Sequence, residues 1–195
     1  TYNPPIDVLL LCTANQCRSP MAEVLLRHHL ATAGVDATVS SAGLYEGGAR
    51  ATAHGRAAMA ERGLDLEHHR SRRLDPEMVA AADLIIGMTR EHVREVAVLD
   101  PSALARAFTL KELVDRARAV GPRLADEPIA EWIARAAAGR RREDLVGMGH
   151  DDALDVDDPV GRGRGDYETT ARLLDDLLSG LVDFAWPVGT REGAA

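Results

Sequence analysis

The sequence predicts an α/β fold in which parallel strands alternate with helices. The first observation is an unbroken apolar run at residues 8–11, which is typical of a parallel strand that helices cover on both faces. The second is that further strand-like segments at 37–41, 84–88 and 107–109 are separated by helix-like segments. This alternation predicts a wound parallel sheet, and 195 residues suit a single domain.

The helices are predicted from their ends. After the first strand (residues 6–11), Pro20 suits the first turn of a helix and Gly34 is placed to end it. Thr52 and Thr89 are candidate N-caps for two later helices. The other predicted helices are one that opens at Asp75 or Pro76, and those at about 110–120, 127–138 and 166–184.

Residues 121–152 depart from the alternating pattern, and we interpret them as an insertion within the one domain spanning 1–195. Their predicted helix carries Trp132 on its apolar face, as a packing anchor. The arginines at 140–142 are expected to form a solvated face. The tail, 189–195, is expected to be flexible.

Composition excludes several classes of protein. A formal net charge of −8 argues against a nucleic-acid partner. Cys12 and Cys17 are the only cysteines and lie in one loop, so neither a disulfide framework nor a cysteine-rich zinc site is expected. No apolar stretch reaches the ~20 residues of a membrane span, and no signal peptide is evident. A cytoplasmic protein without a membrane partner is the expectation.

The loop from Cys12 to Arg18 is the strongest functional feature. A loop that leaves a strand and opens a helix points its backbone N–H groups into one small space, and the helix dipole adds positive potential there. Such a nest binds phosphate, and its field stabilises a cysteine thiolate. The planar guanidinium of Arg18 can hold two phosphate oxygens. The sequence therefore predicts a nucleophile, Cys12, beneath a phosphate cradle made by Thr13, Ala14, Asn15, Gln16 and Cys17.

Five stretches together carry a family resemblance. They are VLLLCTANQCRSPMAE at 8–23, SSAGL at 40–44, HRSRRL at 69–74, ADLIIGM at 82–88 and DVDDP at 155–159. With them the chain resembles the low-molecular-weight protein tyrosine phosphatases of bacteria. The resemblance implies a three-layer fold, with helices on both faces of a four-stranded parallel sheet and the phosphate loop between the first strand and first helix. It also implies hydrolysis of a phosphorylated protein through a cysteinyl-phosphate, without metal or other cofactor, and inorganic phosphate as product and inhibitor.

The same resemblance implies roles for individual residues. Cys12 would be the nucleophile and Arg18 the phosphate clamp. Ser19 would donate a hydrogen bond to the Cys12 thiolate, and Asn15 would hold the strained loop. Asp158, in an Asp-Pro pair, would protonate the leaving group and then activate water. Ser41 and His69 would support Asn15.

Two of these roles have rivals in the sequence. Asp-Pro pairs also occur at 75–76 and 100–101, where they suit helix starts or turns, and only Asp158 lies just before the last helix. Asp157 is the fallback for the acid. Cys17 is either a packing residue or a redox partner that traps Cys12 in a reversible disulfide.

The leaving group stays open between phosphotyrosine and phosphoarginine. The tyrosine-specific members line the pocket mouth with aromatic residues after the Asp-Pro pair, where this chain has Val160 and Gly161. Tyr45 is the one plausible aromatic wall. Gln16 replaces a bulky aliphatic residue of the tyrosine phosphatases and a threonine of the protein-arginine phosphatase branch, which FTLKELV at 108–114 also resembles.

Two other functions stay as alternatives. The same loop binds arsenate, so an arsenate reductase that uses a small-molecule thiol is one of them; a thiol relay within the chain lacks the further cysteines it needs after Cys17. The other is a phosphate-binding module without catalysis, which the presence of both Cys12 and Asp158 disfavours.

Overall fold

The computed structural model, which describes residues 5–141 and 151–187, contains a four-stranded parallel sheet in the order β2-β1-β3-β4. The strands are β1 (Ile6–Cys12), β2 (Ala37–Gly43), β3 (Leu84–Gly87) and β4 (Ala107–Thr109). In register, Leu10 of β1 lies between Ser41 of β2 and Ile86 of β3. The predicted fold class is confirmed; the strand order was not predicted.

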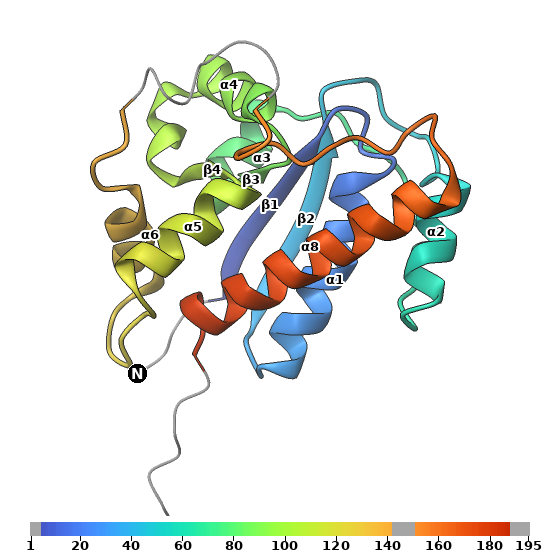
Figure 1. Ribbon diagram of the computed structural model, residues 1–195. Coiled ribbons are helices and arrows are strands. Elements are labelled where there is room, and N and C mark those ends of the chain that lie inside the picture. Colours follow the sequence, from blue (N-terminus) through green and yellow to red (C-terminus); the bar gives the residue numbers. More distant parts are fainter. Residues whose placement is uncertain (1–4, 142–150, 188–195) are drawn as a thin grey trace, which may run out of the picture.

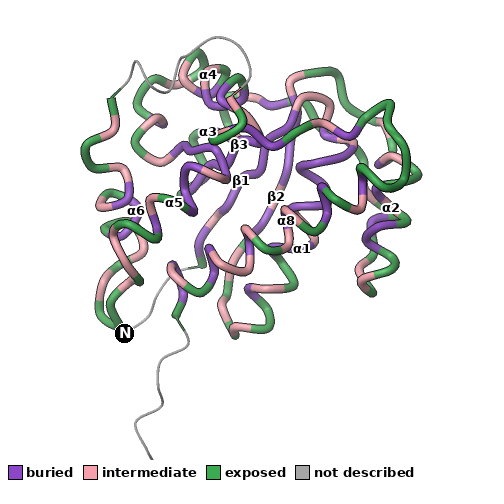
Figure 2. The backbone as a smooth tube through the Cα atoms, in the orientation of Figure 1, coloured by how far each residue is buried: buried purple, intermediate pink, exposed green. Residues whose placement is uncertain are grey.

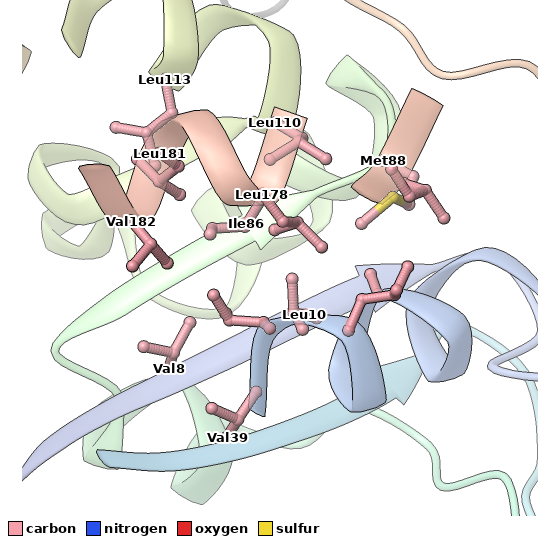
Figure 3. Packing of buried hydrophobic residues seen from close by; sticks show 14 of the residues in the cluster. Val8, Leu10, Val39, Ile86, Met88, Leu110, Leu113, Leu178, Leu181 and Val182 are labelled. Atoms are coloured by element: carbon pink, nitrogen blue, oxygen red, sulfur yellow. The ribbon is translucent and has the colours of Figure 1, made fainter. Parts of the chain in front are cut away.

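Helices cover both faces because the apolar side chains of β1 alternate between them (Figure 1). Val8 and Leu10 pack with the helices α1 (Arg18–Thr32), α5 (Leu110–Val120), α6 (Ile129–Ala137) and α8 (Arg164–Ala185). Leu9 and Leu11 pack on the opposite face with α3 (Pro76–Ala81), α4 (Arg90–Leu99) and the 3₁₀ helix η1 (Pro101–Arg106). Figure 3 shows Leu178, Leu181 and Val182 of α8 over the sheet residues Val8, Leu10 and Ile86.

The helix ends follow the capping chemistry of the sequence. Thr52 accepts a hydrogen bond from Gly55 N–H at the start of α2 (Ala53–Ala60), and Asp75 accepts one from Met78 N–H at the start of α3. Asp100 accepts from Ser102 N–H and opens η1, which was not predicted as a helix. Both rival Asp-Pro pairs therefore act as helix caps. No helix in the described ranges is long and apolar enough to cross a membrane.

The segment read as an insertion packs on the rest of the protein through α6. Trp132 is fully buried, as expected, and its indole N–H donates to the carbonyl of Gly121 at 3.1 Å. The expectation of a solvated arginine face is wrong for Arg140, whose side chain is 5% exposed, paired with Glu112 at 2.8 Å and stacked over the Phe108 ring. Pairing and stacking together make burial of this guanidinium possible. The predicted tail lies outside the described residues, as does most of the segment after Arg141.

The carboxyl ends of the strands are crossed by the segment that precedes α8, drawn in orange in Figure 1. Val156 N–H donates to the carbonyl of Met88, directly after β3, at 2.8 Å. The buried Asp155 carboxylate accepts from the N–H of Arg90 at the start of α4. Figure 2 shows the sheet mostly buried, except at the start of β2, whereas the helices alternate between buried and exposed positions. The loop after β1 and the segment around Asp158 thus meet at one edge of the sheet.

Candidate active site

Cys12 ends β1, and the loop that follows turns directly into α1 at Arg18. Cys12, Arg18 and Ser19 are all at most 4% exposed. Cys17 is the N-cap residue of α1 and provides no side-chain cap, so the first N–H groups of the helix keep their capacity to bind an anion. The Ser19 hydroxyl lies 3.0 Å from Cys12 Sγ. A hydroxyl at this distance stabilises a negative charge on the sulfur.

Asn15 is the residue that fixes the shape of this loop. It is fully buried, and its φ of 53° is the one positive value at a non-glycine residue among the described positions. Its side-chain amide donates to Ser19 Oγ at 2.9 Å and to Ser41 Oγ at 2.8 Å. Its Oδ1 accepts from the backbone N–H of Arg72 at 2.9 Å. These bonds hold a left-handed backbone that would otherwise cost of order 1–2 kcal/mol.

His69 and Gly43 support the loop from behind. His69 Nε2 lies 2.7 Å from the backbone oxygen of Asn15, so the protonated ring nitrogen donates to it. A Cβ on Gly43 would lie 2.7 Å from Asn15 N, and only glycine permits that approach. The structure therefore brings Ser41 and His69 to Asn15, as the family resemblance implies. Gly43 was not singled out, although the SSAGL motif contains it.

Arg18 spans the gap between the loop and the segment before α8. Its Nη2 donates to Asp158 Oδ2 at 2.7 Å, and its Nη1 donates to the carbonyl of Val156 at 2.9 Å. Its Nε is buried and, within the part of the chain that the structure describes, has no hydrogen-bond partner. A buried guanidinium N–H without a partner in the protein is suited to an oxygen of a bound oxyanion.

Asp158 lies at the edge of the site with its side chain 41% exposed, and its Oδ1 accepts from Val160 N–H at 3.1 Å. The Arg18 contact therefore goes to Asp158, the residue selected from the sequence. Asp157, the fallback, is exposed. Its partial exposure and its contact with Arg18 place the Asp158 carboxyl group where it can act on an entering substrate.

Thr13 connects the loop to a buried histidine that sequence reasoning missed. His92 is fully buried, its Nδ1 accepts the N–H of Thr89 at 2.9 Å, and its Nε2 lies 3.2 Å from Thr13 Oγ1. The proton must then be on Nε2, which donates to Thr13. Burial, and secondarily the charge of Arg18, lower the pKa of His92 to about 3, so the ring is neutral. The feature of the sequence that could have identified His92 is its position as the third residue of α4.

Cys17 faces α8. Burial is the main cause that raises the pKa of its thiol to about 12, and the nearby Cys12 adds to this effect. The Tyr167 side chain interacts with both Cys17 and Thr52, and Thr52 N–H donates to the backbone oxygen of Gln16 at 2.8 Å. Cys17 is thus a protonated thiol at neutral pH. Tyr167 was expected only as part of the apolar stripe of the last helix, where it is indeed buried.

The rim of the site is more exposed than the buried loop behind it. Tyr45 is 63% exposed and Val160 is 54% exposed, and the Gln16 side chain is half-buried. Leu44 N–H donates to the carbonyl of Thr13 at 2.7 Å, which places Tyr45 beside the loop. Gln16 belongs to the loop itself, and Val160 lies two residues after Asp158. Within the described part of the chain, these three side chains lack a hydrogen-bonded frame of the kind that surrounds Asn15.

Comparisons with known proteins agree with one another. Residues 7–131 match the family model "Low molecular weight phosphotyrosine protein phosphatase". The chain is 36% identical over 110 residues to a protein-arginine-phosphatase of Bacillus subtilis, covering 56% of this chain and 73% of that protein. It is 38% identical over 107 residues to a probable low molecular weight protein-tyrosine-phosphatase of Ralstonia solanacearum, covering 54% and 71%.

A solved structure adds the chemistry of a relative. It is described as the YwlE arginine phosphatase, a mutant with a phosphorylated active-site serine. It superposes with a TM-score of 0.68 at 29% identity and covers 91% of this chain and 94% of its own. The match to the family model ends before Asp158, so the position of this carboxylate rests on the geometry described above.

Proposed function

The chain belongs to the low molecular weight phosphotyrosine protein phosphatase family, and we propose that it hydrolyses phosphotyrosine in proteins with Cys12 as the nucleophile. The family expected from the sequence motifs is confirmed, and with it an enzyme that acts on phosphorylated proteins. The observation that carries the proposal is the Ser19 hydroxyl 3.0 Å from Cys12 Sγ, with the buried Arg18 guanidinium in the same loop.

In the first step the Cys12 thiolate attacks phosphorus, and the bond from phosphorus to the leaving oxygen breaks. Arg18 donates its unpaired Nε–H to one phosphoryl oxygen. Its Nη2 gives up the hydrogen bond to Asp158 and donates to a second phosphoryl oxygen instead. For this step Asp158 must leave that pair and carry a proton, which it gives to the departing phenolate oxygen, because phenolate leaves poorly without one. The products of this step are tyrosine and a cysteinyl-phosphate.

In the second step Asp158 acts as the base. It takes a proton from water, the water oxygen attacks phosphorus, and the bond from phosphorus to sulfur breaks. Inorganic phosphate leaves and the Cys12 thiolate is restored, held by Ser19. Because phosphate occupies the same N–H groups as the substrate, it is expected to inhibit competitively.

Phosphoarginine is the second candidate substrate. It is favoured by the 36% identity to the protein-arginine-phosphatase of B. subtilis and by the exposed Val160 at a position where tyrosine-specific members of the family have an aromatic residue. The site offers both substrates the same phosphate cradle, and the exposed rim meets the two leaving groups, a neutral phenol and a cationic guanidinium.

Turnover of matched peptides tests this choice. Phosphotyrosine and phosphoarginine are placed at the same position of one peptide, and kcat/KM is measured for each with the wild type and with Cys12→Ser. We expect the higher kcat/KM for phosphotyrosine and no turnover by the variant. A higher value for phosphoarginine would assign the second substrate, and hydrolysis by Cys12→Ser at the wild-type rate would exclude the mechanism.

The role of Asp158 is tested with leaving groups of graded acidity. Aryl phosphates whose phenols differ in acidity are hydrolysed by the wild type and by Asp158→Asn. We expect roughly 10²–10⁴-fold slower hydrolysis for poor leaving groups and a much smaller loss for good ones, because good leaving groups depart without a proton. Asp157→Asn is the matched control and retains activity on all of them. Equal slowing across the series would place the acid elsewhere.

A further inference from the structure

We propose that Glu23 is a positioning residue that acts on the Cys12 thiol through a chain of hydrogen bonds. The intermediate members of this chain are the side chains of Ser41, Asn15 and Ser19. Glu23 closes the CRSPMAE stretch, and the mechanism described above gives it no role. The inference rests on the proposed function, since it takes Cys12 to be the nucleophile.

Each link of the chain is a direct contact. The Ser41 hydroxyl donates to Glu23 Oε2, and Ser41 Oγ accepts from Asn15 Nδ2 at 2.8 Å. The second hydrogen of Asn15 Nδ2 goes to Ser19 Oγ at 2.9 Å. The Ser19 hydroxyl then donates to Cys12 Sγ at 3.0 Å. Four hydrogen bonds therefore connect a carboxylate on α1 with the sulfur at the end of β1.

The direction of the chain is determined by its members. The backbone N–H of Arg72 donates to Asn15 Oδ1, so the amide nitrogen must face the two serines. Ser41 accepts from that nitrogen and has one proton, which needs an acceptor. An ionised carboxylate only accepts, and Glu23 receives this proton. Ser19 likewise accepts from Asn15, and its single proton faces the sulfur of Cys12 at 3.0 Å, with the carbonyl of Ala42 farther away at 3.5 Å.

Burial makes Glu23 difficult to replace in this role. Ser41, Asn15 and Ser19 are all 0% exposed, so in the folded protein the Ser41 proton is shielded from solvent and has Glu23 as its acceptor. Arg27 donates to the other oxygen of Glu23 and also to the carbonyl of Val39 in β2. It offsets the negative charge and holds the carboxylate, whose side chain is 12% exposed, in place.

Glutamine at this position separates the proposal from a merely structural salt bridge. The Glu23→Gln side chain has one oxygen for two donors, Arg27 and Ser41, and its NH₂ group opposes whichever donor it faces. The Ser41 proton or the Arg27 pair loses its acceptor, and the Asn15 amide is no longer held from both sides. The readout is the rate at which iodoacetamide alkylates Cys12, located by mass spectrometry, because this rate reports the thiolate without any substrate.

We expect Glu23→Gln to slow alkylation of Cys12 at pH 6 by roughly tenfold, with kcat/KM falling in parallel. Ser41→Ala should give a similar loss, and adding Glu23→Gln to Ser41→Ala should cause no further loss, because the link is already broken. Glu127→Gln, which breaks a carboxylate–arginine pair with Arg135 of α6 and no member of the chain, should leave alkylation unchanged. If Glu23→Gln does not fold, Glu23→Asp is measured instead. The shorter aspartate side chain keeps the negative charge but places the carboxylate farther from the Ser41 hydroxyl.

Alkylation of Cys12 at the wild-type rate in Glu23→Gln would overturn the proposal. The proposal would also be overturned if Glu23→Gln slowed alkylation as much in the Ser41→Ala variant as in the wild type, since Glu23 would then act by another route. Because alkylation needs no phosphorylated substrate, these outcomes are independent of whether the enzyme prefers phosphotyrosine or hydrolyses phosphoesters at all.

Discussion

The two sides of the phosphate loop are built in opposite ways. Behind the loop, Asn15, Ser41 and Ser19 are fully buried and joined by hydrogen bonds of 2.8–2.9 Å. At its mouth, Tyr45 and Val160 are more than half exposed. The buried side fixes one geometry for the attack on phosphorus, whereas the exposed side is free to vary with the leaving group. Chemistry and substrate choice are thus assigned to different surfaces of one loop.

The largest effect is expected from the clamp on the buried side. Arg18→Lys keeps a positive charge but removes the planar pair of donors, so we expect kcat/KM to fall by roughly 10³-fold or more on any phosphorylated peptide. Steady-state kinetics on both matched peptides measure it, with Arg70→Lys as a control at an exposed arginine. A loss confined to one of the two peptides would mean that Arg18 recognises the leaving group. The division between a catalytic buried side and a substrate-selective rim would then be wrong.

The next largest effect is expected from the residue that holds the loop. Asn15→Gly keeps access to the positive φ but deletes the bonds to Ser19, Ser41 and Arg72, whereas Asn15→Ala loses both. We expect about 10²-fold loss of kcat for Asn15→Gly, and for Asn15→Ala a further loss of stability of order 1–2 kcal/mol. Urea unfolding and kcat are measured for both. Equal free energies of unfolding for the two variants would show that the positive φ at residue 15 does not strain the backbone of the alanine variant.

An acid-sensitive contribution to stability is expected from His92. Its folded pKa of about 3 lies below the ordinary value of 6.5, so between these values the unfolded chain binds the extra proton. Stability contributed by the neutral ring is present above pH 6.5 and is lost as the pH falls toward 3. We expect the wild type to lose roughly 2 kcal/mol more than His92→Gln between pH 7 and 4.5, by urea unfolding.

His28→Gln, at an exposed histidine, is the control for this measurement and should follow the wild type. Parallel pH profiles for the wild type and His92→Gln would contradict the buried, neutral ring. Such a result would also remove the fixed donor to Thr13 from the buried side of the loop.

The smallest effect on the steps that both substrates share is expected from residues at the rim. Gln16→Thr should change the free energy of unfolding by less than about 0.5 kcal/mol, since the side chain is half-buried and outside the Asn15 network. We expect its ratio of kcat/KM for phosphotyrosine to that for phosphoarginine to move severalfold, with alkylation of Cys12 unchanged. A change in alkylation would show that Gln16 belongs to the buried side and not to the rim.

The sequence predicted what local chemistry determines. The strand, loop and helix around Cys12 follow from an apolar run, a nest of N–H groups and Pro20, and the observed β1 and α1 agree with them. The role of Asp158 came from the family resemblance, and its place just before the last helix only separated it from the two rival Asp-Pro pairs. Ser41 and His69 came from the family resemblance, since nothing in their own surroundings indicates contact with Asn15.

What the sequence could not predict depends on contacts between distant segments. His92 was not singled out from the sequence, and Tyr167 was expected only in the apolar stripe of the last helix. Only the packing of α4 and α8 brings them to Thr13 and Cys17. Arg140 read as solvated because charge runs usually are, but tertiary packing provided Glu112 and Phe108. The strand order likewise follows from which faces the helices cover.

The most direct test of the central claim is the covalent intermediate itself. The wild type is mixed rapidly with phosphotyrosine peptide and quenched in acid, and the phosphoryl group is located by mass spectrometry. The account predicts one phosphoryl group on Cys12, which accumulates when Asp158→Asn is supplied with a good leaving group, because the water attack is then slow. A phosphoryl group on any other residue, or turnover with none on Cys12, would contradict it.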